Sequence, residues 1–460
     1  MYTRLFTLCG FEQEEIQQQR ARIDKAFERL EISPDDISRA EERVSRLFDV
    51  ELRGMRLILG IWMKEFLDLV LAKDEGRRVI YGDFPPIRAV MICLANARED
   101  VWVGIPEMVI DIVMGSFFDK SIPVLEAGED SGLPAGAAHC SLLQARLGAL
   151  AKGWVPPPDL ILSSGYLCDQ APKVDELIHK VYGSPVAYTD SFWGQNWGDY
   201  PALKDERVEY FAARIDQSLQ QAEEIIGCHI TEEMKNQANA DNGKVWFGLQ
   251  ALSDYSGKCD PQPLSQADQA MVLELAFGSA RRASESTKAI NTLTREVGQR
   301  AREGKGVVEK GAPRVSWYGP SIVDPELLRM VEGLGLAVCV VNVAWLSPLQ
   351  RSKTKYTDFS RKVAEGYLRE GPPYGSEGVI GHFKQLCEEL KPDGIINCYP
   401  MGCRPCTIAP WMTRRVIQEE FGIPVLTFEY DGGNKRDYGV EQLRTRIEAF
   451  AEVLRAAKSE

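Results

Sequence analysis

The chain lacks the glycine motifs that bind nucleotides, and it has little histidine. No Gly-x4-Gly-Lys-Ser/Thr loop is present to cradle the phosphates of ATP, and no Gly-x-Gly-x-x-Gly follows a predicted strand. Only four histidines occur among 460 residues, so the supply for a histidine-based metal site or a Ser–His–Asp hydrolase is small, although neither is excluded. Chemistry that needs the energy of ATP would therefore depend on another protein.

Long apolar runs and a positive charge balance are missing as well. No segment approaches the ~20 apolar residues that a membrane helix needs. The residues after Met1 soon turn acidic, which argues against a secretory signal. A net charge of −13 argues against non-specific nucleic-acid binding. We expect a soluble, cytoplasmic protein that binds neither nucleic acid nor membrane.

Cysteine, in contrast, is plentiful. The eleven cysteines are odd in number and scattered, which argues against a disulfide framework and leaves packing, metal ligation or redox chemistry. The densest run is Cys398-x4-Cys403-x2-Cys406. Clustered thiolates favour zinc or an iron–sulfur cluster, and a redox pair or chance spacing stays open. No second Cys-x2-Cys or histidine pair follows, which speaks against a closed zinc site.

The hydrophobic pattern predicts an α/β fold with two Rossmann-like domains, each built on a parallel sheet. The predicted strands are 77–81, 122–126, 159–163, 185–188, 314–318, 336–343, 394–398 and 425–429. The predicted segments are an N-terminal helical arm (1–75), a first α/β domain (76–202), a connecting helical segment broken near 240–243 (203–312) and a second α/β domain (313–460). Within the arm, residues 55–71 are predicted as an amphipathic helix for packing or dimerisation.

Three cysteines lie where such domains place functional loops, at strand ends and helix starts. Cys140 begins a predicted helix, and Cys168 and Cys403 each follow a predicted strand. Three thiolates from three loops could hold an iron–sulfur cluster with one open corner, in the crevice between the domains. Cys93 and Cys339 lie inside apolar stretches and are predicted core residues.

Two further segments have both a functional and a structural interpretation. Residues 351–362 are locally basic in an acidic protein and could meet an anionic ligand such as a nucleotide-bearing thioester, or form a solvated loop. The aromatic group at 192–197 could line an acyl pocket or close the edge of a domain.

Four segments carry a family resemblance, and the last two are the most specific: 106–125, 139–169, 392–405 with Gly402-Cys403-Arg404-Pro405, and 422–450 with Glu429-Tyr430-Asp431. In them the chain resembles the cluster-bearing subunits of the 2-hydroxyacyl-CoA dehydratase and benzoyl-CoA reductase superfamily. The resemblance implies that Cys140, Cys168 and Cys403 ligate a [4Fe-4S] cluster. Cys406 is an extra thiol, and therefore a possible fourth ligand or a neighbour. The run from Asp431 to Arg436 departs from the family pattern.

The resemblance also implies partners and an activity. A separate ATPase activator with its own iron–sulfur cluster would supply low-potential electrons, and the substrate would be a CoA thioester. The chain would pair with a related cluster-bearing subunit or with a second copy of itself. Dehydration of a 2-hydroxyacyl-CoA and reduction of benzoyl-CoA type both remain open, as does a double-cubane cluster. The alternatives are a non-catalytic electron relay or scaffold, and a zinc-stabilised binding protein.

Overall fold

The computed structural model describes residues 1–84, 86–134, 139–191, 196–319, 324–341, 346–370, 375–400 and 402–459. Within these residues, two four-stranded sheets form the frame, and all their strands run parallel. The strands are β1 (Arg78–Tyr81), β2 (Val101–Gly104), β3 (Leu160–Ser164), β4 (Val186–Thr189), β5 (Arg314–Tyr318), β6 (Ala337–Val341), β7 (Gly394–Tyr399) and β8 (Val425–Glu429). The predicted α/β fold with two parallel sheets is confirmed.

The two sheets share one topology. The first has the order β2-β1-β3-β4 and the second β6-β5-β7-β8. In each sheet the chain moves to one side of its first strand and then returns to the other side. This reversal creates a switch point, between β1 and β3 in one sheet and between β5 and β7 in the other.

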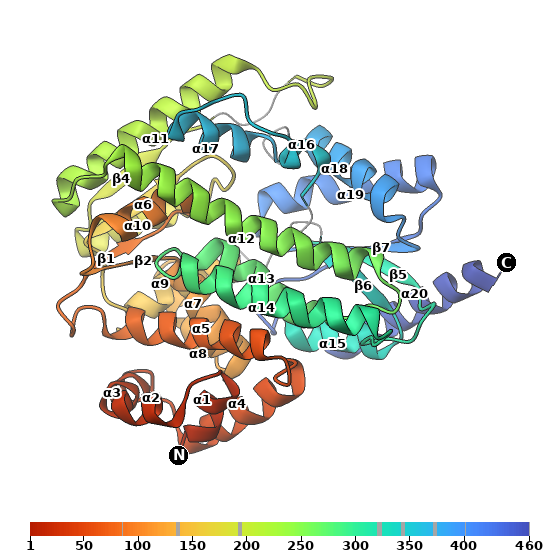
Figure 1. The fold of residues 1–460 in the computed structure, drawn as a ribbon, viewed down its shortest axis with the longest axis horizontal. Helices are drawn as coiled ribbons and strands as arrows, with labels where there is room; N and C mark the ends of the chain where they lie inside the picture. Colours follow the sequence, from red (N-terminus) through yellow and green to blue (C-terminus); the bar gives the residue numbers. More distant parts are fainter. Residues whose placement is uncertain are drawn as a thin grey trace.

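The N-terminal helices form a layer at the bottom of the molecule as drawn in Figure 1. They are α1 (Thr3–Leu8), α2 (Gln13–Gln18), α3 (Arg20–Arg29), α4 (Pro34–Leu47) and α5 (Arg53–Leu71). Ser33 and Asp36 cap the start of α4 reciprocally, which fixes where that helix begins. The predicted amphipathic helix is instead buried on nearly all sides as α5, because it contacts α3, α7, α13 and α14.

Helices surround the first sheet and continue into a long middle segment. Those of the first unit are α6 (Arg88–Ala97), α7 (Pro106–Ile110), the π-helix η1 (Asp111–Phe117), α8 (Ile122–Asp130), α9 (Ser141–Ala151) and α10 (Ala171–Tyr182). The middle helices are α11 (Asp205–Ile226), α12 (Glu232–Lys258), α13 (Gln266–Gly278) and α14 (Ala283–Arg302). Helix α12 crosses the molecule and contacts both α6 and β6, so it ties the two sheets together (Figure 1).

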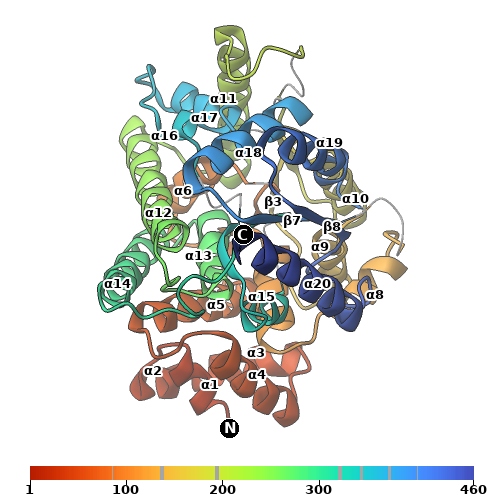
Figure 2. The ribbon, with the colours of Figure 1, turned by 90° about the vertical axis from the view of Figure 1, so that its right-hand side faces the viewer.

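The remaining helices follow or flank the second sheet. They are α15 (Pro325–Gly333), α16 (Pro348–Arg351), α17 (Phe359–Leu368), α18 (Ser376–Leu390), α19 (Arg404–Phe421) and α20 (Val440–Ser459). Although α17 lies between β6 and β7 in sequence, its apolar residues pack into the hydrophobic cluster of the first sheet. Figure 2 shows α17 beside α11, away from β7 and β8. Among the described helices, none has both the length and the hydropathy of a membrane span.

Two predictions of secondary structure are wrong. Residues 122–126 form the first turns of α8 rather than a strand, with a proline in the first turn where a helix tolerates it. A short apolar run of this kind does not distinguish helix from strand. The predicted break at 240–243 is absent, since α12 runs unbroken from Glu232 to Lys258. The short buried strand β2 was not predicted, and the basic stretch predicted as a loop contains the start of α17.

Candidate active site

A cavity of about 760 Å³ lies where the two switch points face each other. Its wall includes Phe84 after β1, Tyr166 after β3, Gly319 after β5 and Pro400 after β7. Ligands of doubly wound sheets bind at such points, outside the carboxyl ends of the strands. The volume is that of a site for a drug-sized ligand.

All four predicted cysteines line this cavity. Cys140 is the residue before α9, Cys168 lies between β3 and α10, and Cys403 is the residue before α19, with Cys406 in the first turn of that helix. Each is partly exposed, and none forms a disulfide. The structure therefore brings together thiols that lie up to 266 positions apart in the chain (140 to 406).

The other predicted cysteines behave differently. Cys93 and Cys339 are fully buried core residues, as predicted. Cys398, although part of the densest cysteine run, is also fully buried, and its thiol donates to the Tyr318 carbonyl at 3.2 Å. Its side chain projects from β7 into the hydrophobic core, because neighbouring side chains of a strand alternate between the two faces of the sheet. The run thus divides into one core thiol and two cavity thiols.

The surroundings of Cys140, Cys168 and Cys403 favour the protonated form of each thiol. Burial raises the pKa of Cys140 well above its usual range, and the nearby Asp431, Cys403 and Cys168 raise it further. Burial raises the pKa of Cys168 to about 12, although the Ala171 N–H, 3.3 Å from its sulfur, opposes the shift. The Cys406 thiol and burial raise the pKa of Cys403. Binding a metal centre here would therefore release protons.

Two glycines allow the domains to approach closely at this point. A Cβ on Gly402, next to Cys403, would stand 2.3 Å from the His139 carbonyl oxygen beside Cys140. A Cβ on Gly433 would stand 2.4 Å from Ser141 Oγ. The Ser141 N–H donates to Asp431 Oδ2 at 2.8 Å, and the Ser141 hydroxyl donates to the other oxygen. Asp431 thus attaches the second domain to the start of α9, where Cys140 lies.

An ion cluster inside the first domain holds α9 in place. The Arg146 guanidinium on α9 pairs with Glu107 at 2.9 Å and with Asp175 at 2.7 Å, and all three side chains are almost completely buried. Glu107 belongs to the Pro106-Glu107 segment that carries part of the family resemblance. Its role here is to orient the helix that begins just after Cys140.

The donor set suits a cluster better than a single ion. Within the described part of the chain, no three His, Cys, Asp or Glu side chains lie close enough together to share one metal ion. In a four-iron cluster each cysteine ligates its own iron, so the ligands stand farther apart. Four thiols line the one cavity, and iron–sulfur clusters prefer cysteine as their ligand.

Cations from the basic stretch line another part of the cavity. Arg351 pairs with Glu389, and Arg369 pairs with Glu365 at 2.7 Å. Among the described residues, the ammonium groups of Lys353 and Lys362 have no ion-pair partner, and both line the cavity. The basic stretch therefore borders the cavity, where two of its lysines have no ion-pair partner among the described residues.

The aromatic group at 192–197 is only partly described. Residues 192–195 lie outside the described residues, and Trp197 is 70% exposed and does not line the cavity. The apolar wall comes instead from α9, α12, α13 and α18, through Leu142, Leu143, Trp246, Phe247, Phe277 and Val379. The predicted helix break contributes as well, because Asn242 and Gly243 face the cavity from within α12.

Sequence reasoning also missed an acidic and aromatic corner of the cavity, made by Tyr166, Tyr367 and Glu370. The two rings meet edge to face with centroids 5.3 Å apart. A signal existed in the sequence, since Phe359, Val363 and Tyr367 follow one another at four-residue intervals, as on one face of a helix that ends just before Glu370.

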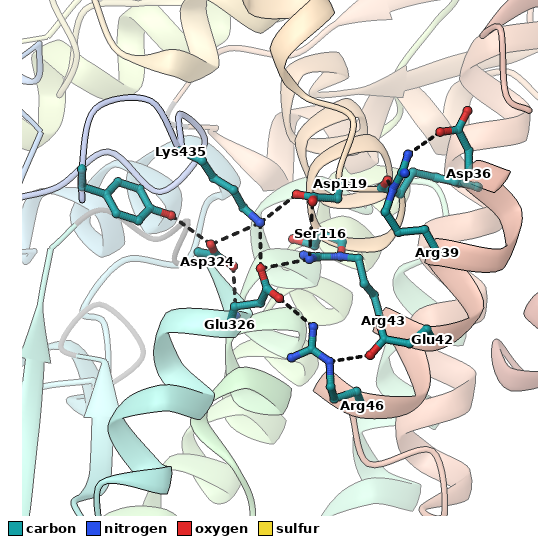
Figure 3. Close-up of polar contacts among 12 residues, drawn as sticks. Asp36, Arg39, Glu42, Arg43, Arg46, Ser116, Asp119, Asp324, Glu326 and Lys435 are labelled. Carbon is teal, nitrogen blue, oxygen red and sulfur yellow. Dashed lines mark hydrogen bonds and ion pairs between the residues drawn. The ribbon is translucent and has the colours of Figure 1, made fainter. Parts of the chain in front are cut away.

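The run that departs from the family pattern takes part in an ion network between the domains (Figure 3). Lys435 pairs with Asp119 of the first domain at 2.7 Å and with Glu326 of the second at 2.9 Å. Glu326 also pairs with Arg43 at 2.9 Å and Arg46 at 2.6 Å, both on α4. This run therefore joins the N-terminal helices to both domains.

Comparison with known proteins identifies the family. The model of the 2-hydroxyglutaryl-CoA dehydratase D-component family matches residues 106–454. The alpha subunit of (R)-2-hydroxyglutaryl-CoA dehydratase from Acidaminococcus fermentans is 23% identical over 312 residues, which cover 66% of this chain and 61% of that subunit.

Two further alpha subunits are similar over more of their own length. That of (R)-2-hydroxyisocaproyl-CoA dehydratase from Clostridioides difficile is 22% identical over 89% of this chain and 98% of the subunit. That of (R)-phenyllactyl-CoA dehydratase from Clostridium sporogenes is 22% identical over 70% of this chain and 77% of the subunit. The family model covers more than half of the chain, including the four cysteines that line the cavity. The chain therefore belongs to the 2-hydroxyglutaryl-CoA dehydratase D-component family.

Proposed function

We propose that this chain is a subunit of a dehydratase that removes water from the CoA thioester of a 2-hydroxy acid. One observation carries the proposal: cysteines from three separate loops line a single cavity at both switch points of a chain in the dehydratase family. The relatives are named as alpha subunits of such dehydratases.

In this proposal Cys140, Cys168 and Cys403 hold a [4Fe-4S] cluster, and the cysteines act as ligands rather than nucleophiles. When bound, such a cluster supplies single low-potential electrons to the thioester. The chain's own residues do the rest. Asp431 and the Arg146 cluster fix the loop and the helix on either side of Cys140. All three cysteines face the cavity between the two sheets.

Substrate binding follows from the distribution of charge. Lys353 and Lys362 would bind phosphate groups of CoA, since phosphate attracts ammonium groups that have no other partner. The apolar wall would enclose the acyl and pantetheine parts. The cavity volume of about 760 Å³ is large enough for that part of the ligand.

We further propose a partner subunit and a separate ATPase activator. The relatives' designation as alpha subunits supports the first. The missing phosphate loop supports the second, because the energy of ATP must then enter through another chain. The eleven cysteines, all free, fit the reducing cytoplasm in which such a complex would work.

A second candidate rests on Cys406. Its thiol lies beside Cys403 on the same cavity wall, so four cysteines could complete the ligand set of one cluster. A cluster without an open position would make the chain an electron relay. A reductive reaction of the benzoyl-CoA reductase type would instead use the same site with a different product.

The test is anaerobic purification followed by iron and sulfide analysis, with visible and electron paramagnetic resonance spectra before and after a 2-hydroxyacyl-CoA is added. Dehydratase function predicts about four iron and four sulfide per site and a spectral change with the ester. A complete cluster whose spectra do not change with any thioester would favour the electron relay. Stoichiometric zinc without iron would refute both. Enoyl-CoA as the product, rather than a reduced thioester, distinguishes dehydration from reduction.

A further inference from the structure

Glu370 differs from the other carboxylates of the cavity. It follows α17 closely, lines the cavity and is partly exposed to it. Within the described residues its carboxyl group has no ion pair and no hydrogen bond. One turn earlier, Glu365 pairs with Arg369 at 2.7 Å. Asp431 accepts the Ser141 N–H and hydroxyl, and Asp169 is also engaged.

The groups around Glu370 and its two tyrosine neighbours come from four elements, and none of them forms an ion pair with Glu370. Tyr166 follows β3 and Tyr367 lies on α17. A negative charge on Glu370 would raise the pKa of both phenols, in addition to the effect of burial. Asp83 after β1 affects the same two phenols. The Arg88 guanidinium on α6 donates to the Ser279 carbonyl at 2.8 Å and to Asn242 at 3.2 Å. No cation among the described residues therefore pairs with Glu370.

The surroundings favour the neutral acid. Burial raises the pKa of Glu370 to about 8, so most of it is protonated at neutral pH. A carboxyl group with a pKa near the working pH can both give and take a proton. Its position also suits such work, because Tyr166 precedes the proposed cluster ligand Cys168 by only two residues.

We propose, building on the dehydratase function above, that Glu370 is a catalytic residue that moves the two protons of the dehydration. The carboxyl group gives its proton to the hydroxyl group that leaves C2 of the acyl chain. The resulting carboxylate takes the proton that leaves C3. One C–O and one C–H bond break, a C2–C3 double bond and one water molecule form, and Glu370 returns to its acid form. The overall conversion involves no net oxidation.

The experiment compares Glu370→Gln, Glu370→Asp and wild type in the complete complex with its activator, under anaerobic conditions. Glu370→Gln should lower turnover by about 10²–10⁴-fold, the usual range for a lost general acid or base. Glu370→Asp keeps an acid and should recover part of the rate. The wild-type rate should fall as the pH rises past about 8, because the acid form is lost. Glu370→Gln should lack that fall.

Two measurements on the chain alone separate chemistry from folding and binding. The infrared carbonyl band of a protonated carboxylic acid at neutral pH should be weaker in Glu370→Gln. Binding of a 2-hydroxyacyl-CoA should stay within about threefold of wild type, since the lost group acts on protons. Glu332→Gln is the matched control. It removes a buried glutamate outside the cavity, bonded to Ser265 and Gln266, and should leave the turnover of folded enzyme unchanged.

The outcomes are distinguishable. Turnover and pH profile unchanged in Glu370→Gln would overturn the role of Glu370 and leave the dehydratase function standing. Loss of ester binding in parallel with turnover would also overturn it, because the residue would then serve binding. A wild-type complex that neither binds 2-hydroxyacyl-CoA nor forms enoyl-CoA would overturn the proposed function itself.

Discussion

The two domains meet in two places, which differ in whether their charged side chains form ion pairs. In the network of Figure 3, each charged group faces an opposite charge, and the Glu326 carboxylate pairs with three cations, Arg43, Arg46 and Lys435. In the cavity, Lys353, Lys362 and Glu370 face open space without an ion-pair partner among the described residues. Polar groups that line a cavity without such a partner are candidates for ligand binding or chemistry rather than for stability.

The difference separates two kinds of residue. Removing a charge from the network should cost folding free energy and leave chemistry intact. Removing a polar group from the cavity should cost binding or turnover and leave folding nearly unchanged. Substitutions in both places can test whether the division holds.

The largest effect is expected at the cavity thiols. Cys168→Ala should abolish the iron–sulfur signal completely, because two remaining ligands do not hold a cluster of this type. The measurement is iron and sulfide content of anaerobically purified protein, together with the visible spectrum. Cys398→Ala is the matched control, since its thiol is fully buried and faces the Tyr318 carbonyl. If Cys168→Ala kept its cluster, the ligand assignment would be wrong.

The most deeply buried of the ion pairs described above are those of Arg146. Breaking them should lower the free energy of unfolding more than any other substitution proposed here. Arg146→Met leaves Glu107 and Asp175 buried without their cation. The expected loss in the free energy of unfolding is about 3–5 kcal/mol, the range for breaking a buried ion pair from one side. Urea denaturation measures it. A loss below about 1 kcal/mol would show that the two carboxyl groups simply take up protons.

Much of this comparison could be anticipated from the sequence, but unequally. The alternation of strands and helices predicted both sheets, because period and length are local properties. Cys140 stood out only through its place at a predicted helix start together with the family resemblance, since its own spacing says little. The strand order does not follow from local pattern, and neither does the approach of Gly402 to His139.

The missed elements fail for physical reasons. Asp431 and Ser141 lie 290 positions apart, so no periodicity relates them. Glu370 follows a helix that packs on the domain other than the one its flanking strands build. Residues 240–243 contain typical helix-breaking types, yet contacts of α12 with α6, α13, α14 and β6 outweigh their weak helix propensity.

At the mouth of the cavity, the expected effect is on binding alone. The double substitution Lys353→Ala with Lys362→Ala should weaken binding of a CoA thioester about 10–100-fold, and the loss should shrink as salt is raised. Titration calorimetry at two salt concentrations measures both effects, with the thermal midpoint as a check on folding. Lys355→Ala is the matched control, because that neighbouring lysine pairs with Asp205 and does not line the cavity. Equal losses in the control and the double variant would contradict an assigned phosphate site.

The smallest effect is expected in the network, where Glu326→Gln should lower the free energy of unfolding by about 1–2 kcal/mol at pH 7, since one of its carboxylate edges still meets solvent. Burial works against ionisation here, but hydrogen bonds from Arg46, Lys435 and Arg43 lower the pKa of Glu326 from 4.5 to about 2. A lowered pKa in the folded state stabilises the fold above pH 4.5, and that stabilisation is lost as the pH falls from 4.5 towards 2. Urea denaturation of both proteins across this window should show the difference shrinking towards acid pH.

Glu42→Gln, which breaks only an exposed pair with Arg46, should cost less than about 0.5 kcal/mol. A turnover that falls in step with the loss of stability in Glu326→Gln would show that the two meeting places are coupled, and the division between them would not hold.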